Sequence, residues 1–219
     1  MTYITFEGGE GSGKSTQAQL LAKRLPDAVV TREPGATILG KKLRSILLDG
    51  LDSDTSEQTV EAQSPTIGPQ AEALLMAADR AQHLIEVIHP ALAANKQVIS
   101  DRSVYSSMAY QGAGRQLGVE HVRQLNNWVV EKCWPDIVVL LDIDRATANN
   151  RLQRPLDRLE QQGDQFHERI LTAYREMAAA DRNRWIVVSA AGSVQDVASR
   201  VWDAIAPLLT ADPENSEAS

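Results

Sequence analysis

The side chains with the clearest chemical purpose lie in a glycine-rich loop near the start of the sequence. Its residues are Gly8, Gly9, Glu10, Gly11, Ser12, Gly13, Lys14 and Ser15. They fit the pattern Gly-x-x-x-x-Gly-Lys-Ser/Thr, whose backbone N–H groups cradle phosphates. Glycine permits the tight curl of the backbone, and a helix that begins at the loop adds the positive end of its dipole. We expect this loop, continued by Thr16, to bind the phosphates of ATP.

Lys14 and Ser15 have separate expected tasks. The Lys14 ammonium can neutralise the β- and γ-phosphates, and the Ser15 hydroxyl can ligate the Mg²⁺ ion that bridges them. The loop alone predicts a phosphate donor and not a reaction, because motors, switch GTPases and small-molecule kinases share it.

Strand and helix patterns alternate along the chain and must position this loop. Short β-rich runs predict buried strands at residues 3–7, 28–31, 97–100, 137–141 and 185–189. Longer periodic stretches predict helices at residues 14–25, 70–95, 119–132, 164–179 and 193–209. This order predicts a doubly wound α/β fold, in which helices flank a parallel five-stranded sheet as in P-loop NTPases. The glycine-rich loop follows the first strand and opens the first helix.

The chain length of 219 residues fits one domain, which we place at residues 1–209. Residues 52–69 are rich in Ser, Thr, Glu, Gln and Pro and predict a mobile surface loop. Residues 210–219 are polar and without periodicity, which predicts a flexible tail.

The composition limits the binding partners and the cellular location that we expect for the protein. The net charge of −7 does not favour general binding to nucleic acid or to an anionic membrane, because both partners are negatively charged. We found no apolar run near the roughly 18 residues of a membrane span and no leader pattern. Cys133 is the single cysteine, so no internal disulfide can form, and its neighbour Trp134 indicates a packed thiol. A cytoplasmic protein is expected.

Several motifs in order give the chain a specific resemblance. They are FEGGEGSGKST from Phe6, TREPGAT from Thr31, AADRAQH from Ala77, DRSVYSSMAYQG from Asp101, PDIVVLLDID from Pro135 and LDRLE from Leu156. Together they resemble bacterial thymidylate kinases over most of the chain, from Thr2 to about Ile205. The resemblance implies transfer of the ATP γ-phosphoryl to dTMP, giving dTDP and ADP in dTTP biosynthesis, and a homodimer.

Arg102 and Asp101 follow the third predicted strand, at the sheet edge where α/β proteins bind ligands. A guanidinium can bind phosphate oxygens bidentately, and the resemblance assigns Arg102 to the thymidylate phosphate. Asp101 could hold Mg²⁺ through a water molecule. The alternative is a surface salt bridge between the two side chains.

The resemblance also implies a site for the thymidine moiety. Arg80 and Ser107 would contact the thymine edge, and Tyr110 and Gln111 would line the sugar. The chain has Met76 where the family usually has a phenylalanine that stacks on thymine. A methionine can still cover a ring, although base selectivity could be looser. Ser103 also departs from the family, which usually has an aromatic residue there.

A predicted turn and an acidic residue of the phosphate loop are both expected beside the acceptor site. Pro34 and Gly35 predict a turn that brings Arg32 and Glu33 over the pocket, with a plain loop as the alternative. Glu10 lies inside the phosphate loop, where an acid repels the ligand unless it has another partner. The resemblance implies that Glu10 contacts the acceptor sugar region. The alternative is a carboxylate exposed to water.

The phosphate loop has no arginine, but three follow much later: Arg151, Arg154 and Arg158. Their spacing would place them on one helical face, although Pro155 disfavours a continuous helix. We therefore expect a helix end and a lid loop over about residues 151–163. The resemblance implies that these arginines stabilise charge on the transferred phosphoryl and that Glu160 approaches the metal or acceptor. The alternative is a solvated basic face paired with Asp157 and Glu160.

The expected mechanism needs no general base, because a phosphate monoester already carries roughly −1.5 to −2 charges near neutral pH. In-line attack on the γ-phosphorus would be assisted by Lys14, Mg²⁺ and the lid arginines. Three alternatives stay open: a kinase for another nucleotide or a sugar acid, a nucleotide-binding switch or regulatory ATPase, and a scaffold without catalysis.

Overall fold

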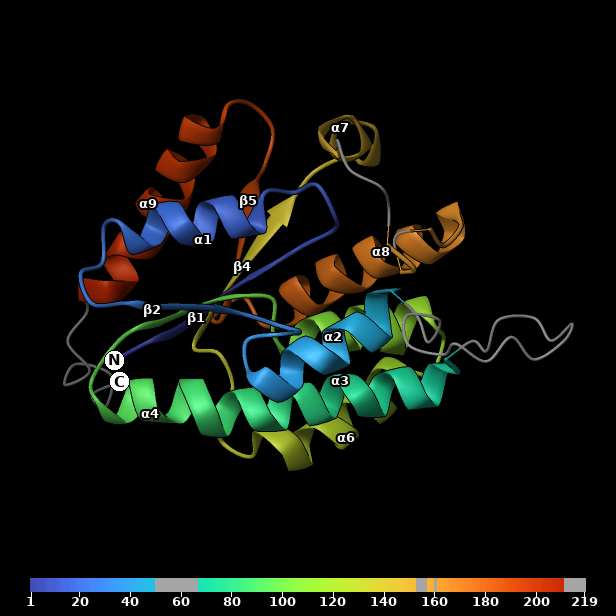
Figure 1. Cartoon of the computed structure of the whole chain (residues 1–219). Helices are drawn as coiled ribbons and strands as arrows, with labels where there is room; N and C mark the ends of the chain where they lie inside the picture. Colours follow the sequence, from blue (N-terminus) through green and yellow to red (C-terminus); the bar gives the residue numbers. More distant parts are fainter. Residues whose placement is uncertain (50–66, 153–156, 160, 211–219) are drawn as a thin grey trace, which may run out of the picture.

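The computed structural model describes residues 1–49, 67–152, 157–159 and 161–210. Its centre is a five-stranded sheet in the order β2-β3-β1-β4-β5, with every pair parallel (Figure 1). The strands are β1 (Tyr3–Glu7), β2 (Val29–Arg32), β3 (Val98–Asp101), β4 (Ile137–Asp142) and β5 (Trp185–Ser189). The predicted parallel five-stranded sheet is confirmed, because long β-branched runs have few alternatives to a buried strand.

Side chains alternate between the two faces of the sheet and build two cores. Ile4 and Phe6 of β1 point into the core shared with α1 (Lys14–Ala22) and α9 (Val194–Thr210). Tyr3 points into the opposite core. α1 buries Lys14, Gln17, Ala18 and Leu21, the spacing of one helical face.

The opposite core is covered by many helical segments. They are α3 (Pro69–His83), α4 (His89–Ala93), α5 (Val104–Ser107), α6 (Val119–Val130) and α8 (Asp164–Ala180), with π-helical turns η1 (Leu84–Ile88) and η2 (Met108–Gly114). α2 (Ile38–Asp49) packs on α3, and α7 (Arg145–Arg151) follows β4 (Figure 1). Helices on both faces confirm the doubly wound architecture.

The strand order places the phosphate loop at a switch point of the sheet. β1 lies between β3 and β4, so the chain leaves β1 where connections diverge to either side. Phe6 pairs with Asp101 in the register, which brings the loop after β1 next to Arg102 after β3. Ligands of open α/β sheets bind at such points.

Some element boundaries differ from the expectations. The helix predicted at 70–95 is a continuous succession of α3, η1 and α4, and it begins one residue earlier at Pro69. The last residue of the predicted mobile loop therefore belongs to α3, whereas residues 52–66 lie outside the described residues. The same applies to 211–219 of the predicted tail, while Thr210 ends α9.

Helices α2, α5 and α7 were not predicted. α2 buries only a narrow stripe, Gly40, Leu43 and Leu47, and leaves Ile38 exposed. α7 is short, and its start is stabilised by the Asp144 carboxylate, which accepts a hydrogen bond from the Thr147 N–H at 2.8 Å. Cys133 is half-buried against the core, as expected, and burial raises the pKa of its thiol. Within the described ranges, every helix is too short or too polar to cross a membrane.

Candidate active site

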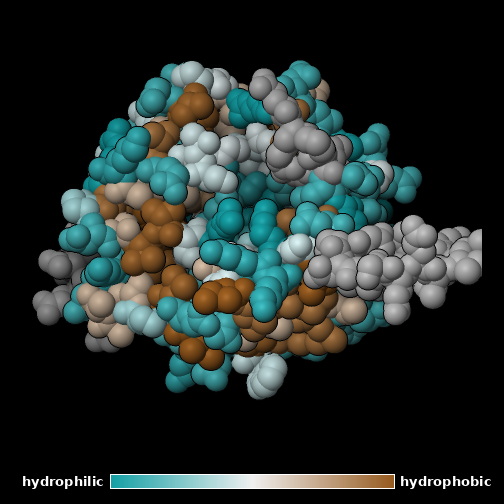
Figure 2. Space-filling model, viewed as in Figure 1, coloured by the Kyte–Doolittle hydropathy of each residue, from teal (hydrophilic) through white to brown (hydrophobic). Residues whose placement is uncertain are grey.

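A cavity of about 660 Å³ opens at the carboxyl ends of β1 and β3. Figure 2 shows a hollow in this face with hydrophilic residues around it. Seventeen predicted site residues line the cavity: Glu10, Gly11, Ser12, Gly13, Lys14, Ser15, Thr16, Arg32, Pro34, Met76, Arg80, Asp101, Arg102, Ser107, Tyr110, Gln111 and Arg151. Residues from distant parts of the sequence are therefore brought to one place.

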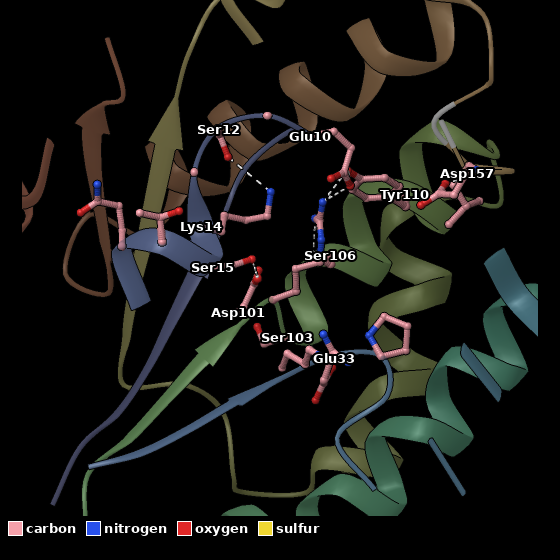
Figure 3. A pocket seen from close by; sticks show the side chains of 18 of the residues that line it. Glu10, Ser12, Lys14, Ser15, Glu33, Asp101, Ser103, Ser106, Tyr110 and Asp157 are labelled. Carbon is pink, nitrogen blue, oxygen red and sulfur yellow. Dashed lines mark hydrogen bonds and ion pairs between the residues drawn. The ribbon is translucent and has the colours of Figure 1, made fainter. Parts of the chain in front are cut away.

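The phosphate loop curls around the Lys14 ammonium. Lys14 Nζ donates to the Gly9 carbonyl at 2.7 Å. It also donates to Ser12 Oγ at 3.3 Å (Figure 3). Gly11 has φ 71° and Gly13 has φ 93°, in the left-handed region that favours glycine. Burial lowers the pKa of Lys14, and the nearby Arg102 charge adds to this. A buried cation at a helix N-terminus suits a phosphate anion.

Ser15 and Asp101 meet at the start of α1. The Ser15 hydroxyl donates to Asp101 Oδ2 (Figure 3). The other carboxylate oxygen, Oδ1, is buried and has no hydrogen-bond partner among the described residues. A hydroxyl beside a carboxylate oxygen that lacks a partner is a donor set suited to Mg²⁺.

Arg102 lies in the part of the cavity that is predicted to bind the acceptor. Its Nη2 forms an ion pair with Glu10 Oε1 and donates to the Tyr110 hydroxyl at 3.0 Å. Although burial alone would lower the pKa of Arg102, the Glu10 charge holds it well above its ordinary value. The alternative salt bridge with Asp101 is not formed between these two described side chains. Glu10 has Arg102 and Tyr110 as partners, so it is not a carboxylate that faces only water.

Arg80 and Ser107 lie together, as the resemblance implied. Arg80 Nη2 donates to Ser107 Oγ at 3.1 Å, and Arg80 Nε donates to Glu33 Oε2 at 2.9 Å. Arg80 Nη1 donates to Asn126 of α6, a residue that sequence reasoning missed. Burial alone would raise the pKa of Glu33, but the charge of Arg80 and a hydrogen bond from His83 hold it below its ordinary value.

The Pro34–Gly35 turn forms a wall of the cavity. Arg32 and Pro34 line it, and the Gly35 N–H donates to Asp79 Oδ1 at 3.0 Å. Asp79 on α3 therefore stabilises the turn by accepting this hydrogen bond. Glu33 also lines the cavity, and its carboxylate pairs with Arg80 and His83.

The remaining residues considered for the acceptor site differ in what they contact. Met76 is half-buried and lines the cavity. Gln111 is buried and its Nε2 donates to Glu72 Oε1 at 3.0 Å. Ser103 donates through its N–H and its Oγ to Glu7 Oε1, both at 2.8 Å. Only the hydroxyl bond depends on the serine, so the family departure at Ser103 provides one hydrogen bond to a buried carboxylate.

The described lid arginines have separate supports. Arg151 ends α7, and its Nη2 donates to the carbonyls of Ala190 and Gly192 at 3.0 and 3.2 Å. Arg158 lies outside the cavity lining, and its Nη2 donates to Glu72 Oε2 at 2.6 Å. Arg151 does lie at a helix end, although the helix itself, α7, was not predicted. The contact of Arg158 with the transferred phosphoryl stays a prediction, and Arg154 and Glu160 lie outside the described residues.

Gly8 and Gly9 belong to the loop but do not line the cavity. Gly8 has φ 140°, and a Cβ there would lie 2.7 Å from the Leu141 carbonyl oxygen of β4. Its role is therefore to let the loop pass close to β4.

Comparisons with known proteins agree with this site. The family model described as thymidylate kinase matches residues 6–201. A thymidylate kinase of Bifidobacterium longum subsp. infantis is 44% identical over 207 residues, 93% of this chain and 83% of the relative. One from Halothermothrix orenii is 41% identical over 209 residues, 91% of this chain and 94% of the relative.

A crystal structure of thymidylate kinase from Ehrlichia chaffeensis is also similar. The TM-score is 0.71 at 29% sequence identity, over 94% of this chain and 98% of that chain. The matched segments include the phosphate loop, the Pro34–Gly35 turn and the Asp101–Gly112 region. The chain therefore belongs to the thymidylate kinase family.

Proposed function

We propose that this protein is an ATP-dependent thymidylate kinase that transfers the γ-phosphoryl of ATP to dTMP and releases dTDP and ADP. The observation that carries the proposal is that one cavity joins a phosphate loop to two arginines suited to an acceptor nucleotide, Arg102 and Arg80. A nucleotide-binding switch would not need the part of this cavity that contains Arg102 and Arg80. The family membership also does not favour another acceptor.

Each half of the cavity would bind one substrate. The N–H groups of the loop and Lys14 would hold the β- and γ-phosphates of ATP. Arg102 would bind the phosphate of dTMP, exchanging part of its contact with Glu10 for phosphate oxygens. Arg80 and Ser107 would meet the thymine edge, with Tyr110 and Glu10 near the sugar.

Magnesium fits the donor set formed by Ser15 and Asp101. The support is the buried Asp101 Oδ1, which has no partner in the described part of the chain. When bound, the ion supplies neutralisation of phosphate charge. The described residues contain no group of three or more His, Cys, Asp or Glu side chains that could hold a metal ion, so further ligands would come from phosphates and water.

The chain's own residues would act by positioning and by charge. A thymidylate phosphate oxygen attacks the γ-phosphorus in line with the departing ADP oxygen. Lys14 would stabilise the negative charge on the γ-phosphoryl and on the β-phosphate during transfer. Arg151, at the end of α7, lines the same cavity. Because the acceptor oxygen is already anionic, no side chain needs to remove a proton.

The test is a coupled assay of ADP formation with ATP and Mg²⁺, run over the common nucleoside monophosphates. We expect dTMP to be the best acceptor by kcat/KM. Faster turnover of uridylate or guanylate would overturn the acceptor assignment. Little turnover of any monophosphate would overturn the kinase proposal itself.

Lys14→Met should lower kcat by at least about a hundredfold, because it removes a charge placed for the transition state. Burial disfavours the charged form of Lys14, so this variant should melt no earlier than the natural protein. A large fall in the melting temperature with unchanged kcat would contradict both parts.

We also propose a homodimer and a cytoplasmic location. Figure 2 shows hydrophobic side chains gathered on the face that α2, α3 and η1 form, and Leu74 of α3 and Ile85 of η1 are 57% and 64% exposed. Such a face suits a second copy of the chain. Sedimentation of the natural protein and Leu74→Asp tests this: a dimer that the variant dissociates is expected, and a monomeric natural protein would overturn it. Cell fractionation tests the location.

A further inference from the structure

A buried carboxylate beside the cavity is not used by the mechanism above. Glu7 ends β1, is fully buried, and does not line the cavity. Its Oε1 accepts from the N–H and the hydroxyl of Ser103. Its Oε2 accepts from the hydroxyls of Ser106 at 2.6 Å and Tyr174 at 2.9 Å. Four hydrogen bonds to a buried carboxylate outside the cavity lining call for a reason.

The first consequence is a fixed direction for two hydroxyl groups. An ionised carboxylate can only accept, so Ser106 and Tyr174 both direct their hydrogens to Glu7. Their oxygens are then left as acceptors. Both lie near Arg102 Nη1, at 3.1 Å from Ser106 Oγ and 3.4 Å from the Tyr174 hydroxyl.

Without the carboxylate this order would be lost. The two hydroxyl oxygens lie 2.9 Å apart, and either could donate to the other. Arg102 Nη1 would then face hydroxyl groups of undetermined direction. The Gly8 carbonyl, 3.3 Å from Nη1, would be its remaining acceptor of fixed direction.

The second consequence concerns the Arg102 backbone. Arg102 has φ 71°, a left-handed conformation that is unfavourable for a residue with a Cβ. On one side its N–H donates to the Phe6 carbonyl at 2.9 Å. On the other side the next N–H, that of Ser103, donates to Glu7. One carboxylate therefore supports both the strained backbone and the guanidinium of Arg102.

We infer that Glu7 is the positioning residue of Arg102, and that it acts through Ser106 and Tyr174. This inference rests on the proposed acceptor role of Arg102. With Nη1 occupied by these acceptors, Nη2 is held toward Glu10 and Tyr110, on the cavity side. Burial raises the pKa of Glu7, so its charge costs stability, and a cost of this kind is typical of groups kept for function.

The substitution Glu7→Gln tests the hydroxyl order with little change in shape. If the amide oxygen keeps Ser103, the amide nitrogen donates to Ser106 and Tyr174, whose hydrogens must then point away from residue 7. One hydroxyl can donate to the other, and the hydrogen of the second is left on the side of Arg102, so a donor there faces the Nη1 donor. KM for dTMP should rise about tenfold, as expected for lost hydrogen bonds to a charged group. KM for ATP should stay within about twofold, since the donor contacts are unchanged.

Thr5→Val is the matched control, because Thr5 is buried on the same strand and its hydroxyl donates to the Ser100 carbonyl. It should leave KM for dTMP unchanged. Thermal melting of every variant shows that folded protein is compared. If Glu7→Gln does not fold, Tyr174→Phe removes one of the two ordered hydroxyls and should raise KM for dTMP severalfold.

Repeating Glu7→Gln in an Arg102→Lys background separates positioning from general support. Lysine has no fork, so the hydroxyl order no longer matters and the effect of Glu7→Gln should nearly vanish. An effect of equal size in both backgrounds, or equal rises in both KM values, would overturn the inference. Absence of dTMP turnover in the natural protein would instead overturn the proposed function.

Discussion

Asp79 should make folding stability fall as the pH rises, against the usual behaviour of carboxylates. It lies on α3 with 1% of its surface exposed. Burial, and then the charge of Glu33, raise the pKa of Asp79 from 3.8 to about 6. A folded-state pKa above the unfolded value means that the folded protein holds the proton more tightly. This stabilisation is complete below pH 3.8 and is lost as the pH rises through 6.

The size of the effect follows from the shift. A displacement of about two pKa units corresponds to about 3 kcal/mol between the two protonation states. The natural protein should therefore lose up to about 3 kcal/mol of unfolding free energy through Asp79 between about pH 4 and pH 7. In an Asp79→Asn variant the amide has no proton to lose, and its oxygen can still accept from the Gly35 N–H.

Urea unfolding of the natural protein and Asp79→Asn, at several pH values from about 4 to 7.5, isolates this contribution. Other acids titrate in both proteins and cancel in the difference. The variant should gain stability relative to the natural protein as the pH rises. Asp203→Asn, on the exposed side of α9, controls for the change in net charge. A difference that is constant with pH, or that moves in the opposite direction, would refute the reasoning.

Two further substitutions test the loop and the lid. Gly11→Ala should raise KM for ATP and lower stability by about 1–3 kcal/mol, because its Cβ would lie 2.4 Å from the Ala148 carbonyl oxygen. Gly68→Ala, where a Cβ meets nothing within 4 Å, should not affect KM; equal effects at both sites would contradict this. Arg158→Ala should lower stability by about 1–3 kcal/mol, because it removes a partner of the buried Glu72, with kcat changed less than about threefold. A kcat loss of about a hundredfold without loss of stability would favour the phosphoryl contact predicted from the sequence.

The strands were predictable to within a residue because β-branched runs of the right length, with turn residues between them, leave few alternatives. α2 was harder for a physical reason. It packs on α3 instead of on the sheet, so only Gly40, Leu43 and Leu47 are buried and the apolar periodicity is weak. The Asp144 cap and Thr147 were a local signal for α7 that could have been used.

The site was predictable where residue type alone restricts the chemistry, as for Lys14 and the loop glycines. It was not predictable where a role depends on a distant partner. Glu7 and Tyr174 are separated by 167 positions, and Arg80 and Glu33 by 47. No spacing rule joins such pairs, because the sheet register and helix packing bring them together. Asn126 was missed for the same reason.

Those distant partners explain how a protein of net charge −7 can hold a phosphate site. Arg102 is paired with Glu10 and Arg80 with Glu33, so neither acceptor arginine is an uncompensated charge. The two pairs differ in access, however. The Arg80–Glu33 pair is buried at 3% and 4% exposure, whereas Glu10 keeps 25% of its side chain exposed. Under the proposed function, a dianionic acceptor would displace the more exposed Glu10 from Arg102, while Arg80 would stay fixed by Glu33 with its side-chain entropy already lost. Exchange of partners at Arg102 would suit the proposed phosphate binding, and rigidity at Arg80 would suit the proposed contact with the base.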